Sequence, residues 1–283
     1  MHVLSIQSSV AYGHVGNSSA TFPLQRLGVE VSPVLTVHFS NHTGYGQWRG
    51  PVFDPADVAD VVTGIEERGV LGTVDAVLSG YLGDVAIGKV VLDALERVRA
   101  VNPDAVYCCD PVMGDVGRGM FVRPGIPEFM RDAAVPVADL VTPNQFELEY
   151  LVGRPVATLE DALAAVAALR DRGPRVVLVT GLVPASGAED VIELLAVDEQ
   201  AAYLVGTPLL DLSVNGAGDM TAALFLAHWH RTGDVRLALE DTTNSVYAVL
   251  EETARTGARE IQIVAAQDAI ARPPRRFTAT RVA

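Results

Sequence analysis

Short apolar segments alternate with longer amphipathic segments along most of the chain. Five apolar runs have the length and composition of buried strands: residues 2–6, 31–37, 74–78, 105–109 and 175–180. Apolar positions recur with helical spacing in residues 17–27, 55–68, 86–100, 159–169 and 235–256. This alternation predicts an α/β protein with three layers, α/β/α, and a central, mostly parallel sheet. Because no linker or internal repeat interrupts it, we expect one domain over residues 1–283.

One helix start carries a strong local signal. Thr142 and Gln145 have the spacing of a capping box, and Pro143 would occupy the first helical position. This interpretation leaves Asn144 and Glu147 without a structural role. Since they lie a turn apart near the start of the helix, they could reach a magnesium ion or its waters.

The remaining boundaries follow from proline, glycine and short apolar runs. Pro33 is expected to break the second strand near its start. Further predicted elements are a brief strand at 140–141, a turn at 184–189, a hairpin of 191–197 with 201–205, and a last strand at 261–264.

The most informative stretch is residues 215–220, in which Gly216, Ala217 and Gly218 precede Asp219 and an apolar helix. Glycines at a helix start expose backbone N–H groups and the positive end of the helix dipole, which can hold a phosphate. Asp219 could then take a proton from an alcohol while these amides stabilise a transferred phosphoryl group. The alternative is a purely structural glycine turn, with an acid that favours the dipole.

Other candidate positions follow predicted strands. Ligands collect at the carboxyl ends of strands in open α/β sheets, and residues 7–14, 79–81 and 110–115 lie there. Asp110 could hold a metal, although an Asp-Pro pair is also a frequent turn. The polar, aromatic segment 39–48 could cover a small ring-shaped ligand or could simply be a connection.

Composition excludes several classes of function. The net charge of −14, with one basic cluster at 272–276, argues against binding to nucleic acid. No apolar run is long enough to span a bilayer, and residues 1–6 lack the basic start and long apolar stretch typical of a signal peptide, so we expect none. Cys108 and Cys109 are adjacent, so a disulfide framework is not expected and the cytoplasm is the expected location. Lys89 is the only lysine, and no glycine-rich loop ends in Gly-Lys-Ser/Thr, so a P-loop is absent.

Several of these segments together resemble the pyridoxal kinases of the ribokinase superfamily. The resemblance runs along almost the whole chain and rests on ordered blocks at residues 6–8, 12–17, 39–45, 79–81, 109–115, 142–147 and 215–219. It implies a ribokinase-like fold and an ATP-dependent kinase that phosphorylates the 5′-hydroxyl of pyridoxal in vitamin B6 salvage. It also implies a homodimer, magnesium and, as a further candidate, a monovalent cation.

The resemblance also implies roles for individual residues. Asp219 would be the catalytic base, with Gly216, Ala217 and Gly218 as the anion hole. The substrate would contact Ser8, Thr43, Gly44, Tyr81 and Asp219. The ATP site would include Asp110, Asp115, Thr142, Glu147, Thr180, Thr207, Pro208, Leu209 and Leu210. Asp110 and Glu147 would lie at the magnesium ion.

Two departures from the family pattern stand out. Ala217 replaces the family's threonine, which removes a hydroxyl but keeps the backbone amide, and the segment 208–215 is short. Two alternative functions stay open. One is a hydroxymethylpyrimidine kinase of the same superfamily, but the block at 41–45 favours pyridoxal as the substrate. The other is a catalytically weak pyridoxal-binding relative, against which the intact Asp219 speaks.

Overall fold

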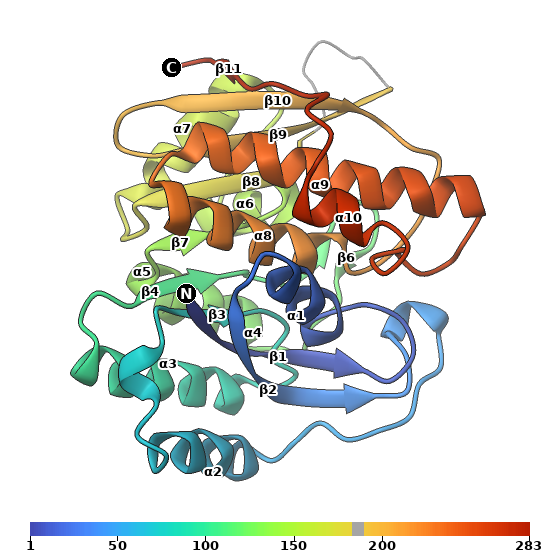
Figure 1. Cartoon of the computed structure of the whole chain (residues 1–283). Helices are drawn as coiled ribbons and strands as arrows, with labels where there is room; N and C mark the ends of the chain where they lie inside the picture. Colours follow the sequence, from blue (N-terminus) through green and yellow to red (C-terminus); the bar gives the residue numbers. More distant parts are fainter. Residues whose placement is uncertain (183–189) are drawn as a thin grey trace.

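One sheet of nine strands runs through the chain, with helices on both of its faces (Figure 1). The computed structural model describes residues 1–182 and 190–283, so the predicted turn at 184–189 lies outside the described residues. The strand order is β11-β10-β9-β8-β7-β4-β3-β1-β2. The predicted three-layer α/β/α fold is confirmed.

The sheet is parallel in its first part and antiparallel at its end. The parallel strands are β1 (His2–Val10), β2 (Glu30–Phe39), β3 (Ala76–Ser79), β4 (Val106–Cys109), β7 (Leu140–Val141) and β8 (Val176–Leu182). The antiparallel strands are β9 (Val191–Val197), β10 (Ala202–Pro208) and β11 (Thr280–Arg281). A separate hairpin consists of β5 (Gly114–Asp115) and β6 (Gly119–Met120). The predicted hairpin after residue 190 is confirmed.

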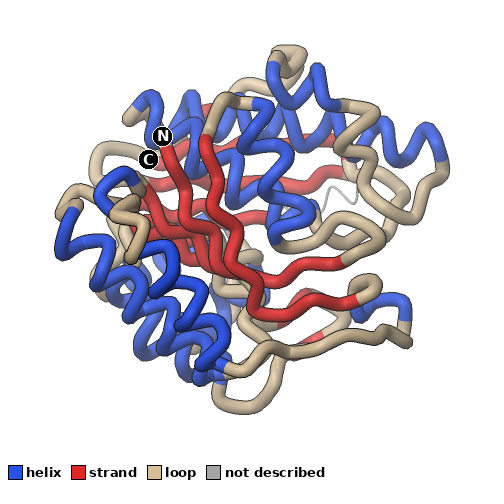
Figure 2. Tube along the Cα trace, turned by 60° about the horizontal axis from the view of Figure 1, so that its bottom comes forward, coloured by secondary structure: helices blue, strands red, loops and turns tan. Residues whose placement is uncertain are grey.

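The helices divide between the two faces of the sheet (Figure 2). One face carries α2 (Pro55–Glu66), α3 (Val85–Val101), α4 (Ile126–Phe129), α5 (Val135–Val137), α6 (Gln145–Val152) and α7 (Leu159–Arg170). The other carries α1 (Asn17–Arg26), α8 (Ala217–Thr232), α9 (Val235–Thr256) and, packed on α9, α10 (Gln267–Ala271). Short turns are η1 (Thr43–Tyr45), η2 (Leu71–Thr73) and η3 (Met130–Ala134).

Alternate residues of each strand point into the two apolar layers. In β1, Leu4 and Ile6 belong to the core under α2 and α3, whereas Val3 belongs to the core under α1 and α8. β8 repeats this, since Val177 packs on the first side and Val176 on the second. A sheet buried on both faces explains why its strands are continuous apolar runs in the sequence. Among the described residues, no helix has both the length and the apolar character needed to cross a membrane.

The predicted capping box of Thr142 and Gln145 is wrong. Helix α6 begins at Gln145, and its cap is Asn144, whose side chain accepts a hydrogen bond from the Glu147 amide at 2.9 Å. Glu147 returns the bond to the Asn144 amide, also at 2.9 Å. Thr142 directly follows β7 and donates its hydroxyl proton to Asp110 at 3.0 Å. Structure therefore does explain Asn144 and Glu147, and the pattern was shifted by two residues.

The predicted strand at 261–264 is also wrong. Ile261 and Ile263 are buried, but they pack against Met220 of α8 and Val249 of α9 rather than pairing with the sheet. The backbone amide of Gln262 donates to the Thr253 hydroxyl, which replaces a ladder bond. Alternating apolar residues on a segment that crosses two helices give the same sequence pattern as a strand.

Pro33 does not break the second strand, which runs unbroken through β2. β2 is the last strand in the order of the sheet, and Pro33 pairs there with Ser5 of β1. On the outer side of β2, a bridge between Val37 and Val52 lies further along the strand. An edge position tolerates the missing N–H group.

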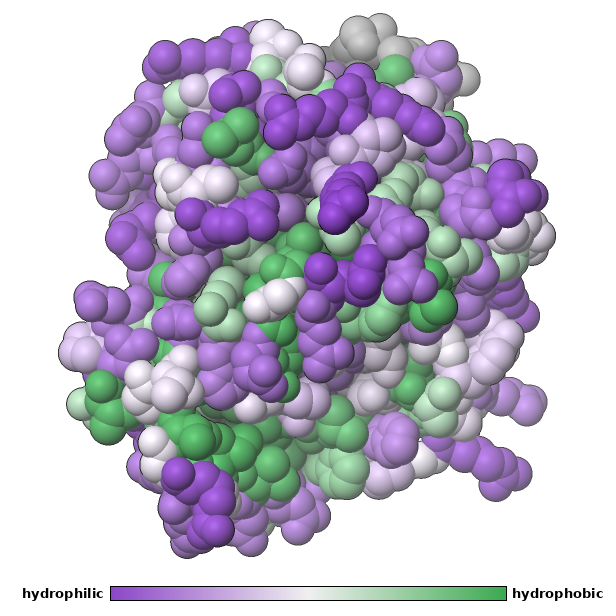
Figure 3. Space-filling model, in the orientation of Figure 1, coloured by the Kyte–Doolittle hydropathy of each residue, from purple (hydrophilic) through white to green (hydrophobic). Residues whose placement is uncertain are grey.

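The surface is polar over much of the face that bears α8 and α9, while apolar side chains gather lower down, around the level of α2 and α3 (Figure 3). The exposed apolar side chains of the described residues include Val61 of α2 and Val101 of α3. Val61 shares the helical apolar spacing of Val58 and Val62, yet half of its surface is exposed, whereas Val58 and Val62 are buried. The buried face of α2 is therefore narrower than the apolar spacing predicts.

Candidate active site

A cavity of about 350 Å³ lies beyond the carboxyl ends of the parallel strands. Its polar lining comes from the ends of β1, β3, β4, β7 and β8, from the 42–43 segment and from the start of α8: Ser8, His42, Thr43, Tyr81, Asp110, Asp115, Arg118, Thr142, Asn144, Glu147, Thr180, Asn215 and Asp219. Its apolar lining includes Val10, Val15, Val37, Phe39, Val112, Phe121 and Val214. Residues far apart in sequence thus meet at one edge of the sheet, as a parallel fold requires.

The start of α8 has the form of an anion hole. Gly216 is its N-cap at φ 91°, a backbone conformation that side chains rarely adopt. A Cβ at this position would lie 1.7 Å from the His14 carbonyl oxygen, while the Ser19 hydroxyl donates to the Gly216 carbonyl at 2.7 Å. Gly218 has open space around it, with nothing within 4 Å of a Cβ. The amides at this helix start therefore face the cavity without side chains in front of them.

Asp219 stands in the first turn of α8 and lines the cavity next to these amides. Burial raises the pKa of the Asp219 carboxyl, and hydrogen bonds from the backbone amides of Gly16 and of Asp219 itself oppose that rise. A raised pKa makes the carboxylate a better proton acceptor than an exposed aspartate. The site can therefore support base chemistry beside a phosphate-binding helix end.

Asp110 forms the acidic side of the cavity. It follows β4, is 6% exposed, and accepts the Thr142 hydroxyl proton at 3.0 Å. Burial raises the pKa of the Asp110 carboxyl well above its usual range, and the negative charges of Glu147 and Asp219 raise it further. Negative charge at Asp110 is therefore unfavourable until a cation joins the cavity.

Glu147 is held more tightly by the backbone. One of its carboxylate oxygens accepts from the Met113 amide at 3.0 Å and the other from the Asn144 amide. Burial nevertheless raises the pKa of Glu147 to about 8, because the amides offset only part of the cost of desolvation. The carboxyl thus fixes the end of β4 to the start of α6, and it borders the cavity at the same time.

The donor set fits a magnesium ion that is shared with phosphate oxygens. Among the described residues, no group of three or more His, Cys, Asp or Glu side chains could hold a metal by itself. Magnesium in kinases needs only one or two carboxylates, with waters and phosphates as the other ligands. Asp110 supplies such a carboxylate, and its raised pKa marks a charge that a divalent cation would offset.

Most of the predicted site residues line this cavity, and five do not. Ser8, Thr43, Tyr81, Asp110, Asp115, Thr142, Glu147, Thr180, Gly216, Ala217, Gly218 and Asp219 all line it. The residues outside its lining are Gly44, Thr207, Pro208, Leu209 and Leu210. Thr207 is buried in β10, and Leu209 is exposed over half of its surface.

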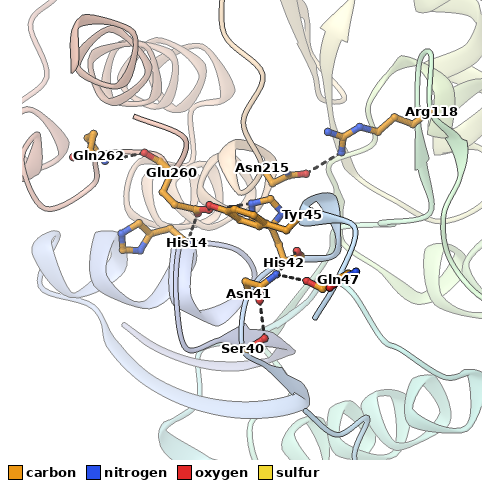
Figure 4. A network of polar contacts seen from close by, with 10 residues as sticks. All are labelled: His14, Ser40, Asn41, His42, Tyr45, Gln47, Arg118, Asn215, Glu260 and Gln262. Carbon is orange, nitrogen blue, oxygen red and sulfur yellow. Dashed lines mark hydrogen bonds and ion pairs between the residues drawn. The ribbon is translucent and has the colours of Figure 1, made fainter. Parts of the chain in front are cut away.

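Sequence analysis missed Arg118, His42 and Asn215 as site residues. Arg118 lies in the turn of the β5–β6 hairpin and donates to the Asn215 side-chain oxygen at 2.9 Å (Figure 4). It is the only lysine or arginine among the described residues that line the cavity. The rarity of basic residues in so acidic a chain was the one available signal, and it does not distinguish Arg118 from the other arginines.

Comparison with known proteins agrees with this geometry. A model of the phosphomethylpyrimidine kinase family matches residues 65–264. The chain is 64% identical over 284 residues to the pyridoxal kinase PdxY of Rubrobacter xylanophilus, and the matched region covers 100% of this chain and 98% of that protein. It is 55% identical over 287 residues to the pyridoxal kinase PdxY of Deinococcus radiodurans, with 99% and 96% covered.

Solved structures give the same result. The pyridoxal kinase from Leishmania donovani in complex with ADP and ginkgotoxin has a TM-score of 0.93 and 29% identity, and covers 100% of this chain and 99% of that one. Its complex with ADP and pyridoxamine has a TM-score of 0.93 and 28% identity, with the same coverage.

Proposed function

The chain belongs to the pyridoxal kinase family, and on that premise we propose that it transfers the γ-phosphoryl group of ATP to the 5′-hydroxyl of pyridoxal, with Asp219 as the base. One observation carries the proposal. Asp219, the open amides at the start of α8 and the acidic group around Asp110 all line one cavity. Phosphoryl transfer requires little more than such positioning and charge placement.

The start of α8 binds the phosphoryl group in transfer. The amides of Gly216, Ala217 and Gly218 point to where negative charge develops, and the helix dipole adds to their effect. The alanine at position 217 serves as well as threonine here, because the group that acts is its backbone amide. Thr221 also donates its hydroxyl proton to the Ala217 carbonyl at 2.7 Å, which helps to hold this turn.

Asp219 receives the proton of the 5′-hydroxyl as the new O–P bond forms. Burial raises the pKa of the Asp219 carboxyl, which makes the carboxylate a better proton acceptor than an exposed aspartate. The amide of Gly16 holds the carboxylate on the cavity side, so the alcohol meets a fixed acceptor. The alcohol, the acceptor and the amides are then within one turn of α8.

Arg118 and a magnesium ion held at Asp110 would together balance the charge of ATP. Asp110 would hold the ion, and Glu147 would act on it through its waters, since backbone amides occupy both carboxylate oxygens. Bound magnesium neutralises phosphate charge. Arg118 supplies a guanidinium next to Asn215, just before the start of α8.

The pyridine ring fits the apolar part of the cavity. Val10, Val37 and Phe39 are buried around Tyr81, and Ser8 and Thr43 add hydroxyl groups to the same wall. A flat ring with polar substituents binds well to a wall that has both apolar side chains and hydroxyl groups. Gly44 would contact the substrate only through its backbone.

The other proposals rest on the family resemblance. Asp115 and Thr180 would border the nucleotide, and residues 207–210 would line its outer part. The chain would be a single domain that acts as a homodimer in the cytoplasm. A monovalent cation beside the phosphates is a further candidate cofactor.

The deciding experiment is an ATP- and magnesium-dependent assay on pyridoxal that follows pyridoxal 5′-phosphate by absorbance. Hydroxymethylpyrimidine is run in parallel by release of ADP, because the matching family model bears the name of a pyrimidine kinase. Turnover on pyridoxal alone is expected. Turnover mainly on the pyrimidine, or pyridoxal binding without turnover, would support one of the two alternative functions instead.

A further inference from the structure

A buried carboxylate outside the proposed catalytic group lies beside the mouth of the cavity. Glu260 is 8% exposed and follows α9 in the segment that leads to α10. It accepts hydrogen bonds from the Tyr45 hydroxyl at 2.7 Å, from the His42 Nε2 atom at 3.1 Å and from the His14 backbone amide at 3.1 Å (Figure 4). One carboxylate thus joins three residues far from it in sequence.

Both segments that Glu260 holds border the cavity. His42 and Thr43 line it from the second strand's side, and Val15 lines it directly after His14. Gly13 leaves room for the carboxylate, because a Cβ there would lie 2.1 Å from a Glu260 oxygen. A residue with a side chain at position 13 would therefore displace the Glu260 carboxylate from its hydrogen bonds.

His42 depends on Glu260 for its orientation. The ring is 7% exposed, and a carboxylate can only accept, so Nε2 carries the hydrogen of this bond. The other ring nitrogen, Nδ1, is buried and has no partner among the described residues. Glu260 is then the one polar side-chain anchor of the ring in the part of the chain that the structure describes.

The neighbouring residue Arg259 holds the same turn from another direction. Its guanidinium carbon lies 3.8 Å from the centre of the Tyr45 ring, which is a cation–π contact. The Tyr45 ring in turn packs on the His42 ring, with centroids 4.6 Å apart. Arg259 and Glu260 therefore both contact Tyr45 of η1, the turn that begins with Thr43.

We propose that Glu260 is a positioning residue for the substrate: it fixes His42 and Tyr45, and so holds Thr43 and the 14–16 segment in place for pyridoxal. The inference rests on the proposed function for the identity of the substrate. None of its three hydrogen bonds reaches the acidic side of the cavity around Asp110, so we expect its loss to raise the KM for pyridoxal more than the KM for ATP.

The test compares Glu260→Ala and Glu260→Gln with the wild type. Steady-state kinetics should show a KM for pyridoxal that rises about tenfold or more in Glu260→Ala, as expected for lost hydrogen bonds to a charged group. The KM for ATP should change by less than about twofold. Glu260→Gln keeps the shape and one acceptor, so its effect should be intermediate. Asp268→Asn is the control, because it removes a charge from an exposed side chain of the same C-terminal region.

Hydrogen exchange separates this inference from the proposed function. In Glu260→Ala the amides of residues 42–46 should exchange faster, with the amides around Asp110 unchanged, whether or not the enzyme acts on pyridoxal. A wild type without pyridoxal turnover would refute the function and leave this exchange result to decide the positioning role. Unchanged exchange at 42–46, or equal rises in both KM values, would overturn the inference.

Discussion

Asp219 combines a raised pKa with a fixed place beside the open amides of α8. Asp219→Asn keeps the size of the side chain and removes the proton acceptor, so kcat should fall about 10²–10⁴-fold. Binding of pyridoxal, measured by equilibrium titration, should persist. Asp211→Asn is a matched control, because that carboxyl lies exposed on the preceding segment. Loss of binding together with kcat would mean that Asp219 shapes the pocket rather than the reaction.

The two glycines of the anion hole should respond differently to alanine. Gly216→Ala forces a side chain onto a positive φ and against the His14 carbonyl, so the free energy of unfolding should fall by about 2–4 kcal/mol. Gly218→Ala meets no atom and should change stability by less than about 1 kcal/mol. Its methyl group would stand before the phosphoryl position, so kcat should drop about tenfold or more. Urea unfolding and turnover assays measure the two effects, and equal stability losses would contradict this assignment.

Single residues also mark a limit of sequence analysis. The glycines and Asp219 could be predicted, because their signal is local: a turn, a helix start and an acid. Glu260 could not be predicted, because its partner His42 is 218 positions away and only the path of the chain after α9 brings them together. Arg118 was missed for a similar reason, since its contact with Asn215 joins a hairpin to the start of α8.

At the scale of elements, β4, α6 and α8 each bring one carboxyl group to the same cavity. Raised pKa values mean that the folded state holds protons which the unfolded chain has already released. For Glu147 this range lies between about 4.5 and about 8, and stability therefore falls as the pH rises through it. Asp110 shares the direction of this effect.

We therefore expect Asp110→Asn to flatten the pH dependence of stability. The asparagine oxygen can still accept the Thr142 hydroxyl proton, but the group no longer titrates. The loss of unfolding free energy between pH 5 and pH 8 should be smaller in the variant than in the wild type. Urea unfolding at several pH values, without nucleotide, measures it. An identical pH dependence of stability in both proteins would show that repulsion between Asp110 and the other buried carboxylates does not cause it. A higher KM for magnesium-ATP is also expected in this variant.

Helices and strands were predicted correctly where the apolar pattern of the sequence fits only one kind of element. The long strands were predicted because burial on both faces leaves continuous apolar runs, and the long helices because burial on one face leaves a helical period. The start of α6 was misplaced because Thr142 and Asn144 both can cap a helix, and only the bond from Thr142 to Asp110 decides between them. The false strand at 261–264 shows that apolar alternation records burial and not pairing.

At the scale of the molecule, the strand order places the ends of β1, β3, β4, β7 and β8 along one edge. In the proposed function, residues that follow β1 and β3 would contact pyridoxal, and residues that follow β4, β7 and β8 would contact the nucleotide. The two ligands would then bind to different parts of one sheet, and each should stabilise the whole fold. Ligands that bind only the folded state add about 2.7 kcal/mol at a concentration of 100 times Kd.

Magnesium-ATP at such a concentration should raise the melting temperature by about 5–10 °C, given roughly 2–4 °C per kcal/mol for a chain of this size. Arg118→Gln removes the one guanidinium that the described residues place at the cavity wall, and a lost charge-assisted bond of about 1.5–3 kcal/mol should cancel half of this shift or more. The shift caused by pyridoxal should stay within about 1 °C of the wild type, because Arg118 contacts the start of α8 and not the ring wall. Arg255→Gln, on the exposed end of α9, is the matched control and should keep both shifts. If Arg118→Gln kept the full nucleotide shift, the positive charge of the hairpin would not be part of the ATP site, and the acidic cavity would rely on the magnesium ion alone.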